Sequence, residues 1–164
     1  MTEAPLPGMG PPARSFRLAS AADIGTVWAL TEAAYASYTA LLGSPPLPVT
    51  EDYRPRVGAG QVHLADLAGT VVGLLVLERH PDYAMIYSVA VLPDRQGEGH
   101  GLALLRLAES EARSWDVPEL RLYTNVRMER NIALYAAVGF RETGRRTHPM
   151  RPGFTIVDMT RPLV

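Results

Sequence analysis

The stretch that decides the fold is residues 93–101, Pro-Asp-Arg-Gln-Gly-Glu-Gly-His-Gly, in which three alternate glycines separate two regular patterns. Before it, residues 84–92 form an apolar and partly β-branched run, which is typical of a buried strand. After it, Leu102 and Leu105 begin a helical spacing that continues to Trp115. Glycine lets the backbone wrap tightly, and a helix start presents unpaired N–H groups at the positive end of its dipole. The stretch therefore predicts a site for an anion such as a pyrophosphate.

Two common phosphate-binding patterns do not fit these glycines. The Walker loop requires a lysine after its last glycine, and the chain contains no lysine. The dinucleotide pattern G-x-G-x-x-G requires a glycine at position 102 or 104, and both positions are leucine. For the loop alone, a glycine-rich turn without a ligand remains the alternative.

Composition limits the classes of function. A chain of 164 residues is long enough for one domain with one core, and an apolar fraction of 47% fits a globular protein. The formal net charge is -1 and no basic stripe stands out, so we expect no nucleic-acid partner. The absence of cysteine removes disulfides, thiolate metal sites and thiol nucleophiles, and we expect no metal.

The ends and apolar stretches predict a cytoplasmic protein without a membrane partner. No apolar stretch approaches the roughly 20 residues of a membrane span. Residues 1–12 lack the basic and apolar regions of a secretory signal. Because proline and glycine are frequent there, we expect residues 1–13 to be a flexible lead-in and residues 14–164 to be a single domain.

The remaining patterns predict an α+β fold with a mixed sheet. Ser20 and Asp23 have the spacing of a capping box that opens a helix. The strand, helix, strand passage over residues 84–125 implies a parallel crossover, whereas predicted hairpins imply antiparallel pairs. The expected strands are residues 15–18, 61–67, 70–79, 84–92, 120–125, 140–148 and 154–161, and the expected helices are residues 20–37, 50–58, 102–115 and 129–138.

Two motifs show a family resemblance. The first is Gln96-Gly97-Glu98-Gly99-His100-Gly101, which has the form Q/R-x-x-G-x-G/A. The second, about 30 residues later, runs from Asn131 to Phe140 as Asn-Ile-Ala-Leu-Tyr-Ala-Ala-Val-Gly-Phe. On these residues the chain resembles the GCN5-related N-acetyltransferase (GNAT) superfamily. The resemblance extends from Phe16 onward and is weakest at residues 38–60, where such enzymes shape the acceptor pocket.

The resemblance implies a GNAT-like sheet of seven strands, splayed between residues 84–92 and 120–125, with acetyl-CoA entering the splay as co-substrate. It implies acetyl transfer to a primary amine, on a small molecule or a peptide. The absence of cysteine, and of a serine with a nearby histidine, favours direct attack in a ternary complex. A homodimer is common in such families. The implied cofactor-binding residues are Val89, Ala90, Val91, Gln96, Gly97, Glu98, Gly99, His100, Gly101, Asn125 and Asn131.

The resemblance also implies catalytic residues. Tyr135 corresponds to a tyrosine near the thioester sulfur, which makes it the expected general acid; the alternative is that it only packs or hydrogen-bonds the cofactor. For Asn131, the alternative to contacting the cofactor is capping the N-terminus of the helix. For the general base we select Glu78 by its position near the sheet centre, and a water relay from backbone carbonyls is equally open. The other candidate bases are His80, Tyr87, Ser88 and His148.

Two further questions stay open at the level of sequence. A noncatalytic acyl-CoA sensor or interaction module on the same fold is the rival to the enzyme, although the presence of Tyr135 favours the enzyme. The acceptor amine, and whether longer acyl groups are used, are not readable. Arg95 and Arg127 have two interpretations, as residues that reach the phosphates of the cofactor or as solvated surface groups. Tyr35, Tyr38 and Tyr53 either line the acceptor pocket or belong to the core.

Overall fold

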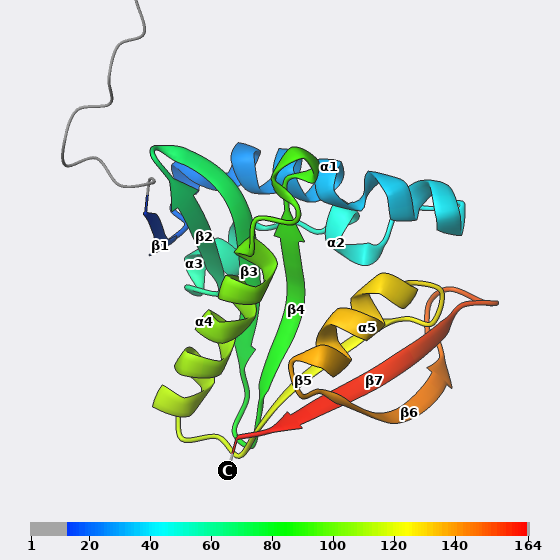
Figure 1. Cartoon of the computed structure of the whole chain (residues 1–164). Coiled ribbons are helices and arrows are strands. Elements are labelled where there is room, and N and C mark those ends of the chain that lie inside the picture. Colours follow the sequence, from blue (N-terminus) through cyan, green and yellow to red (C-terminus); the bar gives the residue numbers. More distant parts are fainter. Residues whose placement is uncertain (1–12, 164) are drawn as a thin grey trace, which may run out of the picture.

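The computed structural model describes residues 13–163, and the expected lead-in therefore lies almost wholly outside the described residues. Seven strands form one mixed sheet, as predicted, and their order across the sheet is β1-β2-β3-β4-β5-β7-β6 (Figure 1). Only β4 and β5 pair in parallel among them. The strands are β1 (Arg14–Leu18), β2 (Val62–Leu67), β3 (Thr70–Arg79), β4 (Ala84–Val91), β5 (Glu119–Asn125), β6 (Arg141–Thr147) and β7 (Thr155–Pro162).

The helices follow the predicted order with two differences. The first helix runs past the expected end at residue 37, because Gly43 supplies the left-handed conformation (φ +77°) that ends it. In place of one helix over residues 50–58 there are two short helices, one before an extended Glu51 and one after it. Pro48 and Pro55 each occupy a first turn, where the missing N–H is not needed. The helices are α1 (Ile24–Leu42), α2 (Leu47–Thr50), α3 (Arg54–Gly58), α4 (His100–Ser114) and α5 (Glu129–Ala137), with 3₁₀ turns η1 (Ala21–Asp23) and η2 (Pro93–Arg95). The backbone N–H of Ser20 donates to the Asp23 carboxylate at 2.8 Å, as the capping-box spacing predicts.

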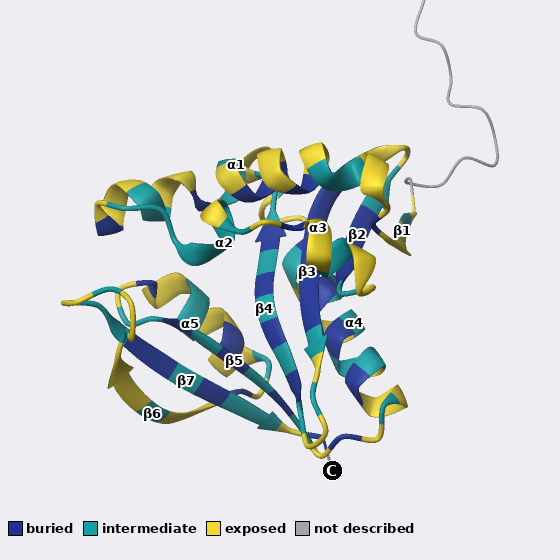
Figure 2. Ribbon diagram, turned by 180° about the vertical axis from the view of Figure 1, so that it is seen from behind, coloured by how far each residue is buried: buried dark blue, intermediate teal, exposed yellow. Residues whose placement is uncertain are grey.

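The core has two layers, one on each face of the sheet. Side chains alternate along β3, so Leu75 and Leu77 pack with α4 while Leu74 and Val76 pack with α1. This burial on both faces explains the continuous apolar run of β3. In Figure 2, β2 and β3 accordingly carry long buried stretches, β4 alternates between buried and intermediate residues, and the outer faces of α1 and α4 are exposed.

The sheet splits where β4 and β5 diverge. The two strands pair only from Ala84 opposite Leu120 to Ile86 opposite Leu122, and both continue for several residues beyond (Figure 1). The register with β3 shifts just there, which makes Tyr87 the extra residue of a β-bulge that bends β4. The predicted splay is thus confirmed, and it leaves one side of β4 without a strand partner.

None of the helices within residues 13–163 has the length and apolar character needed to cross a bilayer.

Candidate functional site

The glycine loop ends in an uncapped helix start. Gly97 and Gly99 have φ of +83° and +86°, a region that side chains rarely adopt, so the loop requires glycine at both positions. Gly99 precedes α4 and offers no side chain to cap it. The first N–H groups of this 15-residue helix therefore have no partner within the helix. They are the groups that the sequence predicts to bind an anion, and the positive end of the helix dipole lies behind them.

A larger cavity of about 740 Å³ lies beside this loop. Its walls come from α1, the end of β4, the start of α4 and α5. Nine of the predicted cofactor residues line it: Val89, Ala90, Val91, Gln96, Gly97, Gly99, His100, Gly101 and Asn131. Glu98 and Asn125 do not line it. Asn125 instead lines a second cavity, and its Oδ1 accepts the backbone N–H of Arg127 at 2.9 Å.

The open edge of β4 presents backbone groups to the larger cavity. Leu92 donates its N–H to Val72 on the β3 side, and N–H groups alternate sides along a strand. The N–H groups of Val89 and Val91 therefore point away from β3, into the splay. The carbonyl of Val89 also faces that way, since it accepts the hydroxyl of Tyr35 at 3.4 Å.

A chain of side chains anchors the glycine loop to the first strand. The Nε of Arg14 donates to His100 Nδ1 at 2.9 Å, and His100 Nε2 contacts the Glu98 carboxylate at 2.9 Å. His100 is 3% exposed. Its ring is therefore committed to the protein, and what it offers to the larger cavity is its backbone N–H.

Charge in the larger cavity is mainly positive. Arg95, Arg127 and Arg130 line it, against the single carboxylate of Glu129. Arg95 also lies 3.7 Å from Glu98 in an exposed pair. Guanidinium groups bind phosphate well, so this wall suits a phosphorylated ligand whose pyrophosphate lies on the α4 start.

A smaller cavity of about 90 Å³ lies on the other side of the splay. The segment between α1 and α2 and the tip of the β6–β7 hairpin enclose it. Its apolar lining is Leu42, Pro46, Leu47, Pro48, Ile86, Leu122, Met128, Phe154 and Ile156. Its polar and aromatic lining includes Tyr87, Ser88, Tyr123, Thr124, Asn125, His148 and Arg151.

Three residues line both cavities and so mark where they meet: Tyr35, Asn131 and Tyr135. Tyr35 is held by Ser88, with 3.1 Å between their hydroxyl oxygens. Asn131 Oδ1 accepts the Tyr38 hydroxyl at 3.0 Å, which leaves the amide N–H groups free to face the cavities. Asn131 is the third residue of α5 and does not cap it.

Tyr135 is buried at this junction, as is Tyr35. Its side chain is 8% exposed, and its hydroxyl has no hydrogen-bond partner within residues 13–163. Burial raises the pKa of the Tyr135 phenol above its ordinary value, and the neighbouring Tyr35 and Tyr38 add to the effect. The hydroxyl therefore stays protonated at neutral pH and is available to donate into the junction.

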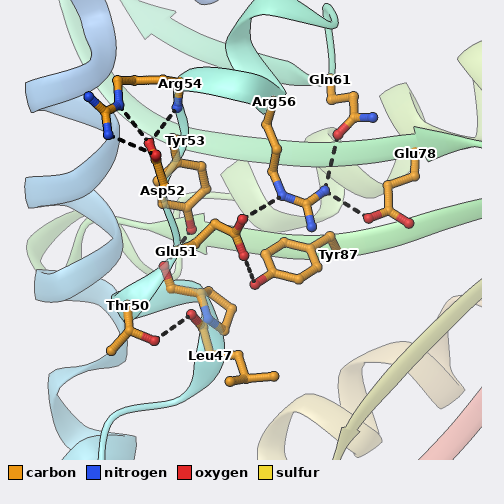
Figure 3. Close-up of polar contacts among 11 residues, drawn as sticks. Leu47, Thr50, Glu51, Asp52, Tyr53, Arg54, Arg56, Gln61, Glu78 and Tyr87 are labelled. Atoms are coloured by element: carbon orange, nitrogen blue, oxygen red, sulfur yellow. Dashed lines mark hydrogen bonds and ion pairs between the residues drawn. The ribbon is translucent and has the colours of Figure 1, made fainter.

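Glu78 lies apart from both cavities, in a polar cluster shown in Figure 3. Arg56 Nη1 donates to Glu78 at 2.7 Å and to Gln61 at 3.0 Å, and His80 contacts Glu78 at 2.9 Å. Burial alone would raise the pKa of Glu78, but the hydrogen bonds from His80 and Arg56 outweigh it and hold the pKa below its usual value. The expected base is thus an ionised, paired carboxylate that the structure does not bring to the junction.

Another carboxylate of the cluster is connected to the smaller cavity. The hydroxyl of Tyr87, which lines that cavity, donates to Glu51 Oε2 at 2.7 Å (Figure 3). Arg56 lies over the Tyr87 ring at 3.8 Å and its Nε is 3.5 Å from Glu51. Burial raises the pKa of Tyr87, and the hydrogen bond to Glu51 raises it further. Tyr87 therefore links the smaller cavity to Glu51 through a proton-bearing hydroxyl.

His148 is not placed to act as a base. Burial and the charges of Arg151 and Arg146 lower the pKa of His148, so the ring is neutral at neutral pH. Its Nδ1 accepts the backbone N–H of Met150 at 3.1 Å, which assigns the ring proton to Nε2. A neutral ring with this tautomer donates a hydrogen bond and has no free nitrogen to accept a proton.

The aromatic residues of the first half separate into two roles. Tyr35 and Tyr38 line the larger cavity, whereas Tyr53 is 2% exposed and donates to the Pro48 carbonyl at 2.6 Å as a core residue. Sequence reasoning missed Arg130, Glu51 and Arg151. None of the three belongs to either family motif.

Comparisons with known proteins agree with this geometry. A sequence model described as "Acetyltransferase (GNAT) family" matches residues 27–140. No curated protein matches the chain at the sequence level. Among solved structures, PaiA N-acetyltransferase from Thermoplasma acidophilum, in complex with coenzyme A, is similar with a TM-score of 0.77 and 18% identity, covering 92% of this chain and 99% of that one.

Two further solved structures share the fold. The ribosomal-protein-S18-alanine N-acetyltransferase from Escherichia coli has a TM-score of 0.72 and 21% identity, covering 92% of this chain and 94% of that one. YncA from Salmonella typhimurium, with its cofactor acetyl-CoA, has a TM-score of 0.69 and 21% identity, covering 93% and 95%. At these identities the likeness is one of fold.

Proposed function

The chain belongs to the GNAT acetyltransferase family, and on that premise we propose that it transfers the acetyl group of acetyl-CoA to a primary amine by direct attack in a ternary complex. Acetyl-CoA is the co-substrate of this family. The single observation that carries the proposal is the meeting of the two cavities at Tyr35, Asn131 and Tyr135. A cofactor in the larger cavity and an amine in the smaller one then meet without an acyl-enzyme.

The residues of the larger cavity fit the cofactor. The unpaired N–H groups at the start of α4 bind the pyrophosphate, and Arg95, Arg127 and Arg130 supply positive charge around it. The N–H groups of Val89 and Val91 bind the extended arm and the thioester oxygen, where negative charge develops during attack. Bound acetyl-CoA supplies the thioester carbon that the amine attacks.

The reaction requires a path for the proton of the amine. The nitrogen–carbon bond forms, the carbon–sulfur bond breaks, the nitrogen loses a proton and the thiolate gains one. An alkyl amine with a pKa near 10 is only about one part in a thousand neutral at pH 7. Tyr87 accepts the proton from the cavity side as its own proton passes to Glu51 at 2.7 Å. The Glu51 side chain is 28% exposed, so the proton continues to solvent.

Glu78, the base expected from sequence, connects to the smaller cavity only through Arg56, which does not give up its proton at working pH. We therefore place Glu78 as a residue that positions Arg56 beside Tyr87 and Glu51.

Tyr135 serves the leaving group. Its hydroxyl has no partner within residues 13–163 and donates to the sulfur as negative charge builds there. With an ordinary phenol pKa of about 10 and a thiol pKa of about 8.5, full proton transfer is uphill by roughly 2 kcal/mol. The raised pKa of Tyr135 increases this cost, so the hydrogen bond to the sulfur precedes transfer of the proton.

A thiol-release assay with acetyl-CoA and a panel of primary amines tests the proposal, together with calorimetric titration of acetyl-CoA. We expect micromolar binding of the cofactor and turnover with at least one amine. Binding without turnover on any amine would instead identify a noncatalytic acyl-CoA sensor on this fold. Absence of cofactor binding would contradict the assignment of the larger cavity.

A further inference from the structure

The lining of the smaller cavity limits the kind of amine that fits it, and the inference below rests on the proposed function. No Asp or Glu lines this cavity within the described part of the chain, whereas Arg151 does. A polyamine would place a second ammonium group in this cavity, where no carboxylate lines the wall to pair with it.

Arg151 is the unusual residue of this lining. It is half-buried at the tip of the β6–β7 hairpin, and no carboxylate pairs with it within residues 13–163. Its neighbours on β6 are paired, Arg145 with Glu142 at 2.6 Å and Arg146 with Asp158 at 2.8 Å. An unpaired guanidinium on the wall of a mostly apolar cavity is a suitable partner for a carboxylate, which it can bind through two parallel hydrogen bonds.

The size of the cavity restricts the occupant further. A volume of about 90 Å³ favours a small molecule over an extended chain. The reacting amine lies at the Tyr135 end, and Arg151 lies on the hairpin that closes the same cavity. One small molecule therefore carries both the amine and the anion, and its remaining atoms contact apolar side chains such as Leu47, Met128 and Phe154.

We propose that the acceptor is a small amino acid with an apolar side chain, whose carboxylate is bound by the Arg151 guanidinium while its amine lies at the junction of the two cavities. His148 assists, because the neutral ring presents its Nε2–H as a donor without adding a second charge. Asn125 and Thr124 supply further polar lining.

The test compares amines of one carbon skeleton in the thiol-release assay: L-leucine, L-leucinamide and 3-methylbutylamine, with spermidine as the polycationic alternative and a leucyl dipeptide amide as the peptide alternative. We expect kcat/KM for L-leucine to exceed that of each other amine at least tenfold, as loss of a charge-assisted hydrogen bond predicts. Preference for spermidine, the dipeptide amide or 3-methylbutylamine would overturn the inference.

Variants assign the preference to Arg151. Arg151→Gln is expected to raise KM for L-leucine at least tenfold, to leave kcat within about twofold, and to leave kcat/KM for 3-methylbutylamine unchanged. Arg145→Gln, on the same hairpin but paired and lining neither cavity, is the matched control and should behave as the parent. Equal loss with both variants, or none with Arg151→Gln, would contradict the role of Arg151.

The same experiment separates this inference from the proposed function. Turnover of 3-methylbutylamine or spermidine with no preference for L-leucine would leave amine acetylation standing and remove only the acceptor class. No turnover with any amine, while calorimetry records acetyl-CoA binding, would remove both.

Discussion

The hydroxyl of Tyr38 in α1 donates a hydrogen bond of 3.0 Å to Asn131 Oδ1 in α5, and so joins the two halves of the splayed sheet. The two residues are 93 positions apart in the sequence. Both line the larger cavity, so this hydrogen bond connects α1 to α5 across the place where acetyl-CoA is proposed to bind.

Removing the hydrogen bond between Tyr38 and Asn131 should weaken cofactor binding. Tyr38→Phe leaves the Asn131 amide without its orienting partner, at a cost of about 1 kcal/mol, or about fivefold in the Kd of acetyl-CoA. Calorimetric titration measures the change. In a double-mutant cycle with Asn131→Ala we expect a coupling energy above about 0.5 kcal/mol, whereas purely additive effects would show that the bond does not act on the cofactor.

Loss of the Tyr135 hydroxyl should affect turnover and little else. Tyr135→Phe is expected to lower kcat about a hundredfold, within the usual range for a general acid, and to change the Kd of acetyl-CoA less than twofold. Because the hydroxyl has no partner within residues 13–163, the urea midpoint should barely move. Tyr83→Phe, whose ring stacks on His80 outside both cavities, is the control. An unchanged kcat would remove the acid role.

Substituting Glu51 and Glu78 in turn shows which carboxylate of the polar cluster receives the proton of the amine. Glu51→Gln should lower kcat/KM about a hundredfold, since Glu51 receives the proton through Tyr87. Glu78→Gln should lower kcat/KM much less, because Glu78 contacts Arg56 and His80 rather than Tyr87. The reverse pattern would restore Glu78 as the base, and an unaltered kcat/KM in both variants would favour a water relay from backbone carbonyls.

The anchor of the glycine loop should also be measurable. Arg14→Gln removes the hydrogen bond to His100 Nδ1 and loosens the residues that present N–H groups to the pyrophosphate. We expect the Kd of acetyl-CoA to rise about fivefold with kcat unchanged. Arg17→Gln, on the same strand but paired with Asp23 at 2.8 Å, should leave the Kd as it is. Equal effects from the two variants would point to a general loss of stability.

Stability should fall on mild acidification because of His63. Burial in β2 lowers the pKa of this ring, and the charge of Glu111 only partly offsets the effect. Below the ordinary histidine pKa of about 6.5 the unfolded chain therefore binds more protons than the folded one, so the free energy of unfolding decreases as pH falls toward the folded pKa. Urea unfolding at pH 7.5 and pH 5 should show a smaller difference for His63→Gln than for the parent.

Much of the fold could be predicted because its signals are local. The apolar run of β4, the periodicity of α4 and the turn residues between strands each lie within a few positions of what they determine. The boundary errors have local causes too. The extension of α1 to Leu42, and the presence of two short helices at Leu47–Thr50 and Arg54–Gly58 in place of one over residues 50–58, both follow from where Gly43, Pro48 and Pro55 fall.

The candidate site was predictable where backbone alone defines it. Gly97 and Gly99 adopt conformations that require glycine, and nine of the eleven expected cofactor residues line one cavity. The choice of base was not predictable in this way. Glu78 lies near the sheet centre as expected, but Arg56, 22 positions earlier, engages its carboxylate. No pattern within either segment indicates that pairing.

The sequence by itself therefore determined the glycine loop, the order of strands and helices and the family, since each depends on backbone conformation or side-chain periodicity along neighbouring residues. Only the tertiary structure decided which side chains share a cavity. Tyr35, Asn131 and Tyr135 meet because β4 and β5 diverge after three paired positions, and Arg151 reaches the smaller cavity because the β6–β7 hairpin folds over it. Such contacts depend on how distant segments pack, and no local preference of the chain encodes them.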